Sequence, residues 1–487
     1  MKNYIYLIAV ALLMVGCSSE NEPSTLNPQP SALNYINLAI SVNGGVNSSS
    51  RAVPAGGEDG DGREAGFTRE NAITGITLIL YQGTGVNAAA STAIDFVAYY
   101  PVSRVAKDAD SRIEATYETG NCLVPHNTID FTKTYHAIVV ANANLTSSLT
   151  AGSSTLGDVR DMTVAQIYRG DETKSAQQCE AFVMASEQDN TLNFSASGVM
   201  SRDAAGDYIY NLTSQPLVIE RLAARIDFWA KNSNGYKTSA ENAAYTIPGY
   251  EYNVTGSTDK FVVTGIVPFN IVNGHATYGN EYIIKRIRTD ISDAATTSYL
   301  ADETTTNYVI DPQTTAKTGS DGLTSSLESV YDLIGDGSKL ENTTYNPYFH
   351  SIESMRVTNG MSTIETKENV VVAYPMENTL NTTSMLYYYA TGIAVVGYYY
   401  VNGTGTGTRY VYLGYLRHQG EADSYDIMPY TTPLETTATL GANPMRFGIV
   451  RNNIYRVWIG SIDQKGEMEL KIKVKKWDPY THDFIYM

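Results

Sequence analysis

Cys17 is the first residue whose setting predicts covalent chemistry. It follows an apolar run over residues 4–16, which comes soon after Lys2. A bilayer span takes about 20 apolar residues, so this run is too short for a single-pass anchor and has the length of a secretory signal's hydrophobic region. Met14 stands where a lipoprotein signal usually has leucine, but small residues precede Cys17 and a polar stretch comes after it. The pattern predicts a lipoprotein signal over residues 1–17, with lipidation of Cys17.

Arg51 is the second residue whose surroundings predict a covalent change, here cleavage of the chain by a protease. It ends a Gly- and Ser-rich segment and is the first basic residue after the signal. Loops of small polar residues are preferred sites of proteolytic cutting. The sequence predicts cleavage between Arg51 and Ala52, with residues 18–51 as a pro-segment. The alternatives are an ordinary loop after a first strand, or a cut at Arg63 or Arg69.

The predicted pro-segment contains an apolar strand. Residues 33–42 alternate with a period of two, the pattern of a half-buried β-strand. The apolar positions are Ile36, Leu38, Ile40 and Val42. At about 1.5–3 kcal/mol per buried aliphatic side chain, their removal costs roughly 6–12 kcal/mol, comparable with the stability of a whole domain, about 5–15 kcal/mol. A subunit that loses this strand would therefore need a replacement, and strand addition supplies one.

Catalytic and metal-binding patterns are absent from the sequence. The six histidines are scattered, without the HExxH spacing of a zinc site. There is no nucleophile elbow, phosphate-binding loop or CxxC pair. We therefore predict no catalytic residue, no metal, no cofactor and no enzyme activity. Cys122 and Cys179 could pair in an exported protein or remain two buried thiols, and the sequence leaves both open.

The composition favours an extracellular globular protein. The chain has 487 residues, enough for two or three domains, and carries a net charge of −17. That charge argues against nucleic acid as a partner. Tyrosine is abundant, with 37 residues against 11 phenylalanines, which suits strands half exposed to water or facing another subunit.

Many short strands and few helices predict an all-β fold of antiparallel sandwiches. The strands are expected over residues 73–81, 94–100, 135–143, 217–229, 261–267, 385–401, 409–416, 454–462 and 468–477, and the helices over 156–167 and 325–334. The polar cluster at 231–235 predicts a boundary between domains at 52–230 and 231–487.

The end of the chain predicts an extended tail. Pro479 cannot donate a ladder hydrogen bond, so it should separate the strand at 468–477 from the last eight residues. In the tail, Phe484 and Tyr486 point to one side and Ile485 to the other.

The order of these motifs resembles the fimbrillins of type V pili, the major fimbrial subunit family of Bacteroidales. The resemblance is carried by the signal at Cys17, the Ser-rich loop ending at Arg51, and six further segments, whereas residues 232–380 show little of it. These segments are ITGITLILYQG at 73–83, HAIVVANAN at 136–144, LVIERLAARIDF at 217–228, GIVRNNIYRVWIGSI at 448–462 and IKVKKWD at 472–478, together with the alternating strand at 33–42.

The resemblance implies two transthyretin-like β-sandwich domains and a lipidated precursor in the outer membrane. It also implies an arginine-specific protease that cuts at Arg51 and an extracellular fimbrium supporting adhesion. Its partners would be copies of itself or related fimbrial subunits, joined by strand exchange. The donor would be the C-terminal segment, here the tail with Phe484, Ile485 and Tyr486. The ligand on a host or bacterial surface is unspecified.

Two other functions stay open. A tip adhesin would share this plan but lack a usable C-terminal donor. A surface glycan-binding lipoprotein would keep residues 18–51 and present aromatic clusters, for which the tyrosines at 387–389 and 398–400 are candidates. Tyrosines inside strands are more often packing residues.

Overall fold

The structure is a computed structural model. It describes residues 32–42, 63–66, 70, 72–83, 88–104, 116–160, 162–164, 182–186, 190–269, 282–283, 350–353, 369–375, 378–379, 391–418, 425–429, 448–449, 451–464 and 468–481.

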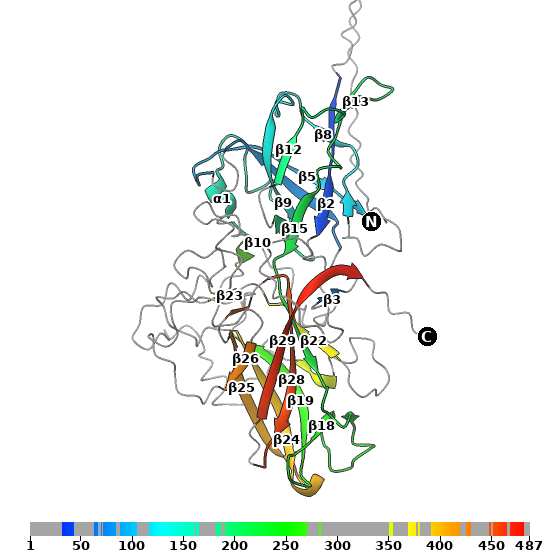
Figure 1. Ribbon diagram of the computed structural model, residues 1–487, viewed down its shortest axis with the longest axis vertical. Helices are drawn as coiled ribbons and strands as arrows, with labels where there is room; N and C mark the ends of the chain where they lie inside the picture. Colours follow the sequence, from blue (N-terminus) through cyan, green and yellow to red (C-terminus); the bar gives the residue numbers. More distant parts are fainter. Residues whose placement is uncertain are drawn as a thin grey trace, which may run out of the picture.

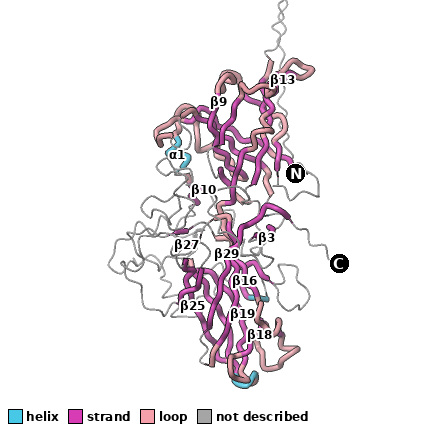
Figure 2. Tube along the Cα trace, viewed as in Figure 1, coloured by secondary structure: helices cyan, strands magenta, loops and turns pink. Residues whose placement is uncertain are grey.

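The described residues form an all-β fold with two bodies stacked along the long axis (Figure 1). Among the described residues, helical structure is confined to short segments such as α1 (Leu156–Arg160) and the 3-10 turn η5 (Val401–Gly403), as Figure 2 shows. The all-β prediction is confirmed.

The first body contains two sheets. The larger has the strand order β5-β4-β9-β11-β15-β2-β7-β6, with β12 also paired to β9. Its strands are β2 (Ala39–Val42), β4 (Gly75–Tyr81), β5 (Ile94–Pro101), β6 (Ser103–Arg104), β7 (Thr116–Glu118), β9 (Thr134–Ala141), β11 (Met184–Ser186), β12 (Asn190–Asn193) and β15 (Leu217–Arg221). The smaller sheet has the order β13-β14-β1-β8. Its strands are β1 (Asn34–Asn37), β8 (Cys122–Val124), β13 (Met200–Arg202) and β14 (Tyr208–Asn211).

The second body also contains two main sheets. One has the order β22-β16-β28-β29-β3, and the other the order β17-β18-β19-β24-β25-β26 with β21 paired to β19. The first comprises β3 (Arg63–Gly66), β16 (Arg225–Trp229), β22 (Asn369–Ala373), β28 (Asn453–Ile462) and β29 (Met468–Thr481). The second comprises β17 (Tyr236–Lys237), β18 (Gly249–Asn253), β19 (Lys260–Phe269), β21 (His350–Ser351), β24 (Gly392–Tyr400), β25 (Thr408–His418) and β26 (Tyr425–Pro429). Two short pairs complete the described strands: β10 (Thr163–Val164) with β20 (Tyr282–Ile283), and β23 (Asn378–Thr379) with β27 (Gly448–Ile449).

Each body has its own apolar core, and the first core reaches across the joint. Val371, Tyr374 and Ile454 come from the second part of the chain but pack into the cluster of the first body. The second cluster is built from β16, β19, β24, β28 and β29, among others. The joint between the bodies is therefore packed by apolar side chains from both.

Most predicted strands are confirmed, and the predicted alternation in the last one holds. Met468, Leu470 and Ile472 are buried, while Glu469 and Lys471 are exposed. The two strands predicted on either side of the turn at 403–407 pair as β24 and β25. The helix predicted over 325–334 lies outside the described residues.

One predicted helix and one predicted strand differ from the structure in this part of the chain. The helix predicted over 156–167 ends at Arg160, and residues 163–164 pair as β10 instead. The single strand predicted over 217–229 is two strands, β15 in the first body and β16 in the second. The chain passes between the bodies at 222–224, where Leu222, Ala223 and Ala224 are buried. Because all three residues at this passage are apolar, the sequence contains no turn signal that would have divided the predicted strand. The predicted boundary at 231–235 lies after β16, one strand later than this passage.

Candidate functional site

The segment 34–42 contributes a strand to both sheets of the first body. β1 lies between β14 and β8 in the smaller sheet, and β2 lies between β15 and β7 in the larger sheet. Leu38 separates the two strands and is itself fully buried. The single strand predicted from the alternating pattern is therefore two, because the chain changes sheets at Leu38.

Both strands are paired along both edges. In β1, Ile36 lies opposite Tyr210 in the parallel pair with β14 and opposite Cys122 in the antiparallel pair with β8. In β2, Ile40 lies opposite Leu217 in the parallel pair with β15 and opposite Tyr117 in the antiparallel pair with β7. Loss of this segment would thus open a slot inside each sheet, with unpaired backbone groups on both of its sides.

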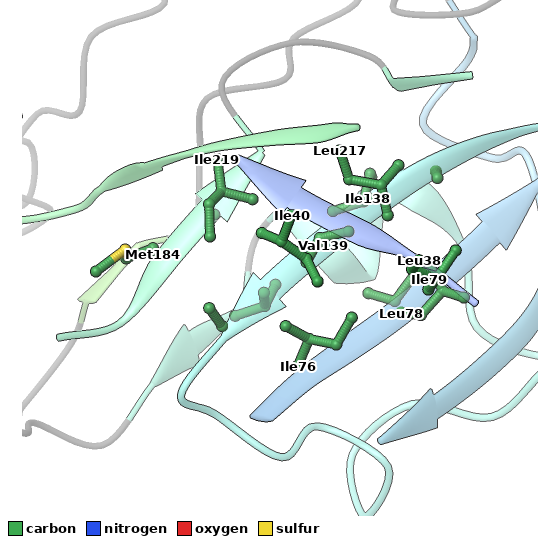
Figure 3. Packing of buried hydrophobic residues seen from close by; sticks show 14 of the residues in the cluster. Leu38, Ile40, Ile76, Leu78, Ile79, Ile138, Val139, Met184, Leu217 and Ile219 are labelled. Carbon is green, nitrogen blue, oxygen red and sulfur yellow. The ribbon is translucent and has the colours of Figure 1, made fainter. Parts of the chain in front are cut away.

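The side chains of this segment belong to the main core. The four predicted apolar residues, Ile36, Leu38, Ile40 and Val42, all have 0% exposure. Figure 3 shows Leu38 and Ile40 among core residues that include Leu78, Val139 and Leu217.

The prediction that this strand is half buried is wrong for β2. Ala39 and Ser41, on the face opposite to Ile40, are also buried. Burial of both sets of side chains means that both faces of the larger sheet are covered at β2. An antiparallel sheet with one solvated face gives a clean alternation, whereas a strand covered on both faces need not show it.

The start and the crossing point of the segment are hydrogen-bonded as well. Leu33 N–H donates to Asp207 Oδ1 at 2.8 Å, and Leu33 O accepts from Tyr208 N–H at 2.8 Å. At the crossing, Leu38 N–H donates to Thr119 Oγ1, and Thr119 N–H donates back to Leu38 O, each at 3.1 Å. The sheet change therefore leaves the backbone groups of Leu38 satisfied.

The other predicted site residues lie outside the described residues. These are Cys17, Arg51, Ala52, Phe484, Ile485 and Tyr486. Of the predicted site, the structure describes the strand 34–42 and the C-terminal strand up to Thr481.

The C-terminal strand continues beyond the predicted stop. β29 pairs antiparallel with β28 from Met468 to Lys476, and then pairs in parallel with β3 as far as Thr481. The prediction that Pro479 ends this strand is wrong. The register shifts between Asp478 and Thr481, so the ladder passes over the proline, which has no N–H to donate.

A buried ionic cluster lies at the joint between the two bodies. Arg225 donates to both carboxylate oxygens of Asp227, from Nε at 2.7 Å and from Nη2 at 2.8 Å. Its Nη1 donates to Glu70 Oε2 at 3.2 Å, and the hydroxyl of Tyr374 donates to Glu70 Oε1. Arg456 Nη2 lies 3.5 Å from Asp227 Oδ2. Burial acts to lower the pKa of Arg225, but Asp227 and Glu70 outweigh it and raise that pKa well above its usual value.

Arg221 connects this cluster to Asn452, the residue immediately before β28. Its Nε donates to the backbone carbonyl of Glu70 at 3.0 Å, and its Nη1 donates to Asn452 Oδ1 at 2.8 Å. Asn452 has a left-handed φ of 60°, a conformation that asparagine tolerates better than most residues. The N–H of Asn452 also donates to Ala223 O at 2.8 Å. The sequence marks Arg221 and Arg225 only as breaks in an apolar pattern, because their partners are distant in the chain.

Other groups offer little chemistry. Cys122 is a buried free thiol, and burial raises its pKa, which disfavours the reactive thiolate. In the part of the chain that the structure describes, no cluster of three or more His, Cys, Asp or Glu side chains is placed to hold a metal ion. The described helices include none with the length and apolarity to cross a membrane. Of the tyrosines at 398–400, Tyr399 and Tyr400 are buried and Tyr398 is half-buried, packed against the cluster that contains Tyr400. These three are packing residues, as expected for tyrosines inside a strand, whereas 387–389 lie outside the described residues.

Comparison with known proteins finds similarity among solved structures alone. No family model matches the chain, and no curated protein matches it at a significant level. A candidate cell adhesion protein from Parabacteroides distasonis is 12% identical, with a TM-score of 0.43, over 92% of this chain and 98% of that one.

Two of the similar structures are from Porphyromonas gingivalis. A fimbrilin is 12% identical with a TM-score of 0.36, over 93% of this chain and 99% of that chain. The tip fimbrial protein Mfa3, with a C-terminal truncation, is 8% identical with a TM-score of 0.36, over 91% and 100%. The solved structures that this chain is similar to thus include cell adhesion and fimbrial proteins of these two genera.

Proposed function

We propose that this chain is a structural subunit of a cell-surface fimbria that supports adhesion. On this proposal it is exported as a precursor lipidated at Cys17, held in the outer membrane, and cut after Arg51 by an arginine-specific protease. Cut subunits then join copies of themselves or related subunits into an extracellular fimbrium by strand exchange. The proposal includes two sandwich domains in tandem, the first joined to the pro-segment and the second carrying the C-terminal donor.

The observation that carries the proposal is the position of residues 34–42. They form an internal strand of both sheets, yet they precede Arg51 in the chain. A cut at Arg51 would break the covalent link between these strands and the rest of the fold. A protein with no use for the vacated slot would not be expected to place an internal strand on the far side of a cleavable loop.

The energies support exchange over simple loss. Four aliphatic side chains at 0% exposure represent roughly 6–12 kcal/mol of burial. That is close to the whole stability of a typical domain, about 5–15 kcal/mol. The emptied slot would also leave backbone groups unpaired on β15 and β7. A donor strand from another subunit restores both the burial and the hydrogen bonds.

The test is to compare cleavage with assembly in matched variants. Wild-type precursor, Arg51→Lys and Arg51→Ala are each treated with an arginine-specific protease or with trypsin, and assembly is followed as SDS-resistant ladders. Trypsin accepts lysine, so Arg51→Lys should assemble after trypsin but not after the arginine-specific enzyme, and Arg51→Ala should assemble after neither. Ladders from uncut Arg51→Ala protein would overturn the proposal, and so would a wild-type chain that is cut at Arg51 but stays monomeric.

A further inference from the structure

We propose that the fold protects two arginines from cleavage and thereby sets where the pro-segment ends. Three arginines, Arg51, Arg63 and Arg69, lie between the predicted signal and β4, and an arginine-specific protease accepts the same residue type at each. The inference rests on the processing step of the function proposed above, because it concerns which of the three bonds the protease cuts. The paired strand β3 excludes the second arginine, and the buried residue Glu70 excludes the third.

Cleavage by a protease requires an accessible segment of chain. Exposed loops are therefore cut before paired or buried segments. A bond inside folded structure is cut through local opening, and the rate then follows the population of the opened form. Every contact that must break before a bond can enter the protease slows cleavage at that bond.

The bond after Arg63 lies within a strand ladder. Arg63 begins β3, where it lies opposite Lys476 of β29, and Glu64 lies opposite Trp477. Both residues of the bond are thus paired. β3 is the edge strand of its sheet, and Figure 1 shows it beside the curved end of β29. Cleavage after Arg63 would require β3 to separate from β29.

The bond after Arg69 is held through its second residue, Glu70, which has 0% exposure. The Glu70 carboxylate accepts hydrogen bonds from Arg225 Nη1 at 3.2 Å and from the hydroxyl of Tyr374. Its backbone carbonyl accepts a hydrogen bond from Arg221 Nε at 3.0 Å. Both arginines are buried as well. Cleavage after Arg69 would require a buried carboxylate to leave its ion pair, which is costly.

The consequence for the mature subunit is that it keeps β3. A cut after Arg69 would separate β3 from the rest of the chain, and a cut after Arg63 would remove its first residue. Arg51 precedes β3 and Glu70, so a cut there leaves these contacts unbroken. The end of the pro-segment is then determined by the fold and not by the sequence preference of the protease.

The experiment measures cleavage at each of the three bonds. The full-length precursor carrying Cys17→Ala is treated briefly with an arginine-specific protease. The new N-termini at residues 52, 64 and 70 are labelled and quantified by mass spectrometry as a function of time. Two sets of variants then weaken the two protected bonds separately.

The hold on β3 is weakened from the side of β29, so that the sequence around Arg63 stays unchanged. Adjacent residues of a strand direct their N–H groups to opposite edges, so Trp477→Pro/Asp478→Pro removes the donor that faces β3, whichever of the two it is. The matched control Trp477→Ala/Asp478→Ala removes the same side chains and keeps both N–H groups. Both positions lie beyond Lys476, the last residue that β29 pairs with β28.

The hold on Glu70 is weakened by two further variants. Glu70→Gln removes the charge that pairs with Arg225. Because this change alters the substrate itself, its rate is divided by the rate for the same bond in a synthetic peptide of residues 60–75 with the same substitution. Tyr374→Phe removes one donor to Glu70 and leaves the sequence around Arg69 unchanged, so it decides the outcome if Glu70→Gln does not fold.

The wild-type precursor should yield the N-terminus at residue 52 at least about tenfold faster than those at 64 and 70. The proline variant should raise cleavage after Arg63 at least about tenfold over its alanine control, without a change after Arg69. Glu70→Gln should do the reverse, and Tyr374→Phe should act in the same direction as Glu70→Gln with a smaller effect.

The proposal is overturned if wild type is cut after Arg63 or Arg69 as fast as after Arg51. It is also overturned if the variants raise cleavage at neither bond, or at both bonds alike, because a general loss of stability would act on both. A wild-type chain that is cut at Arg51 alone and never forms SDS-resistant ladders would overturn strand exchange and leave the protection standing.

Discussion

Glu70 Oε2 accepts a hydrogen bond from Arg225 Nη1 at 3.2 Å, although 155 residues separate the two in the chain. Both side chains are buried, at 0% and 3% exposure. Glu70 lies just beyond the predicted cleavage loop, and Arg225 begins the first strand after the crossing between the bodies. The pair therefore fixes the early part of the mature chain to the joint.

Breaking this pair should destabilise the whole protein. Arg225 would keep its hydrogen bonds to Asp227, but without Glu70 the buried cluster has one carboxylate for the guanidinium groups of Arg225 and Arg456. Removing one partner of a buried ion pair costs about 3–5 kcal/mol. We expect Glu70→Ala to lower the free energy of unfolding by that amount in urea denaturation. The control is Lys133→Ala, which removes an exposed pair with Asp130 at 3.7 Å and should have a far smaller effect, because exposed ion pairs contribute little to stability. Equal effects of the two variants would show that the joint is not held by the buried pair.

The strand 34–42 should stabilise the uncut precursor through its side chains. Ile40 is fully buried in β2, so Ile40→Ala should cost about 2–5 kcal/mol. Leu123, in the neighbouring sheet, is 48% exposed, so Leu123→Ala should cost far less. Urea unfolding of the uncut chain measures both. A small effect at Ile40 would mean that this segment does not fill the core of the precursor.

The turn after β24 should respond to acid. Asp259 Oδ2 accepts from the hydroxyl of Tyr399 at 2.6 Å, and Oδ1 accepts from Asn402 N–H at 2.7 Å. The hydrogen bond from Tyr399, and then that from Asn402, lowers the pKa of Asp259 below 3.8. A depressed pKa in the folded state means that the unfolded chain binds the proton first as pH falls. The stabilisation is thus complete above the unfolded pKa and is lost as pH drops through the folded one.

The measurement is the difference in free energy of unfolding between wild type and Asp259→Asn, taken at several pH values. We expect wild type to be the more stable at pH 7, and the difference to shrink below about pH 4. A difference that is constant with pH would contradict the assignment.

Export should depend on Cys17. Replacing it by alanine removes the predicted lipid attachment, so Cys17→Ala cells should lose both outer-membrane precursor and surface fibres while the protein still folds. Fractionation and electron microscopy measure the two losses, and Cys122→Ala is the matched cysteine control. Normal fibres in Cys17→Ala cells would show that lipidation of Cys17 is not needed for fibre formation.

Local sequence patterns were enough to predict which side chains of a strand are buried and which are exposed. The alternation from Met468 to Ile472 correctly places one buried and one exposed face, because side-chain direction in a strand depends on its own backbone. The same reasoning correctly predicted burial for Ile36 and Ile40. These features need no knowledge of what lies across the core.

The sequence did not predict features that depend on distant partners. Nothing in the pattern around Leu38 shows that the chain changes sheets there, because the apolar period continues through it. Pro479 indicated the end of a strand, yet a register shift lets the ladder continue to Thr481. The link from Glu70 to Arg225 likewise joins residues that no local window contains.

In the proposed mechanism, residues 34–42 leave the subunit when it joins a fibre. The most direct measurement is the intact mass and N-terminal residue of subunits recovered from purified, denatured surface fibres. Cleavage followed by strand exchange should give chains that begin at Ala52, with no peptide from residues 18–51 retained in the fibre. Fibres whose subunits begin at Cys17, or which hold the 18–51 segment in equal amount to the mature chain, would contradict it.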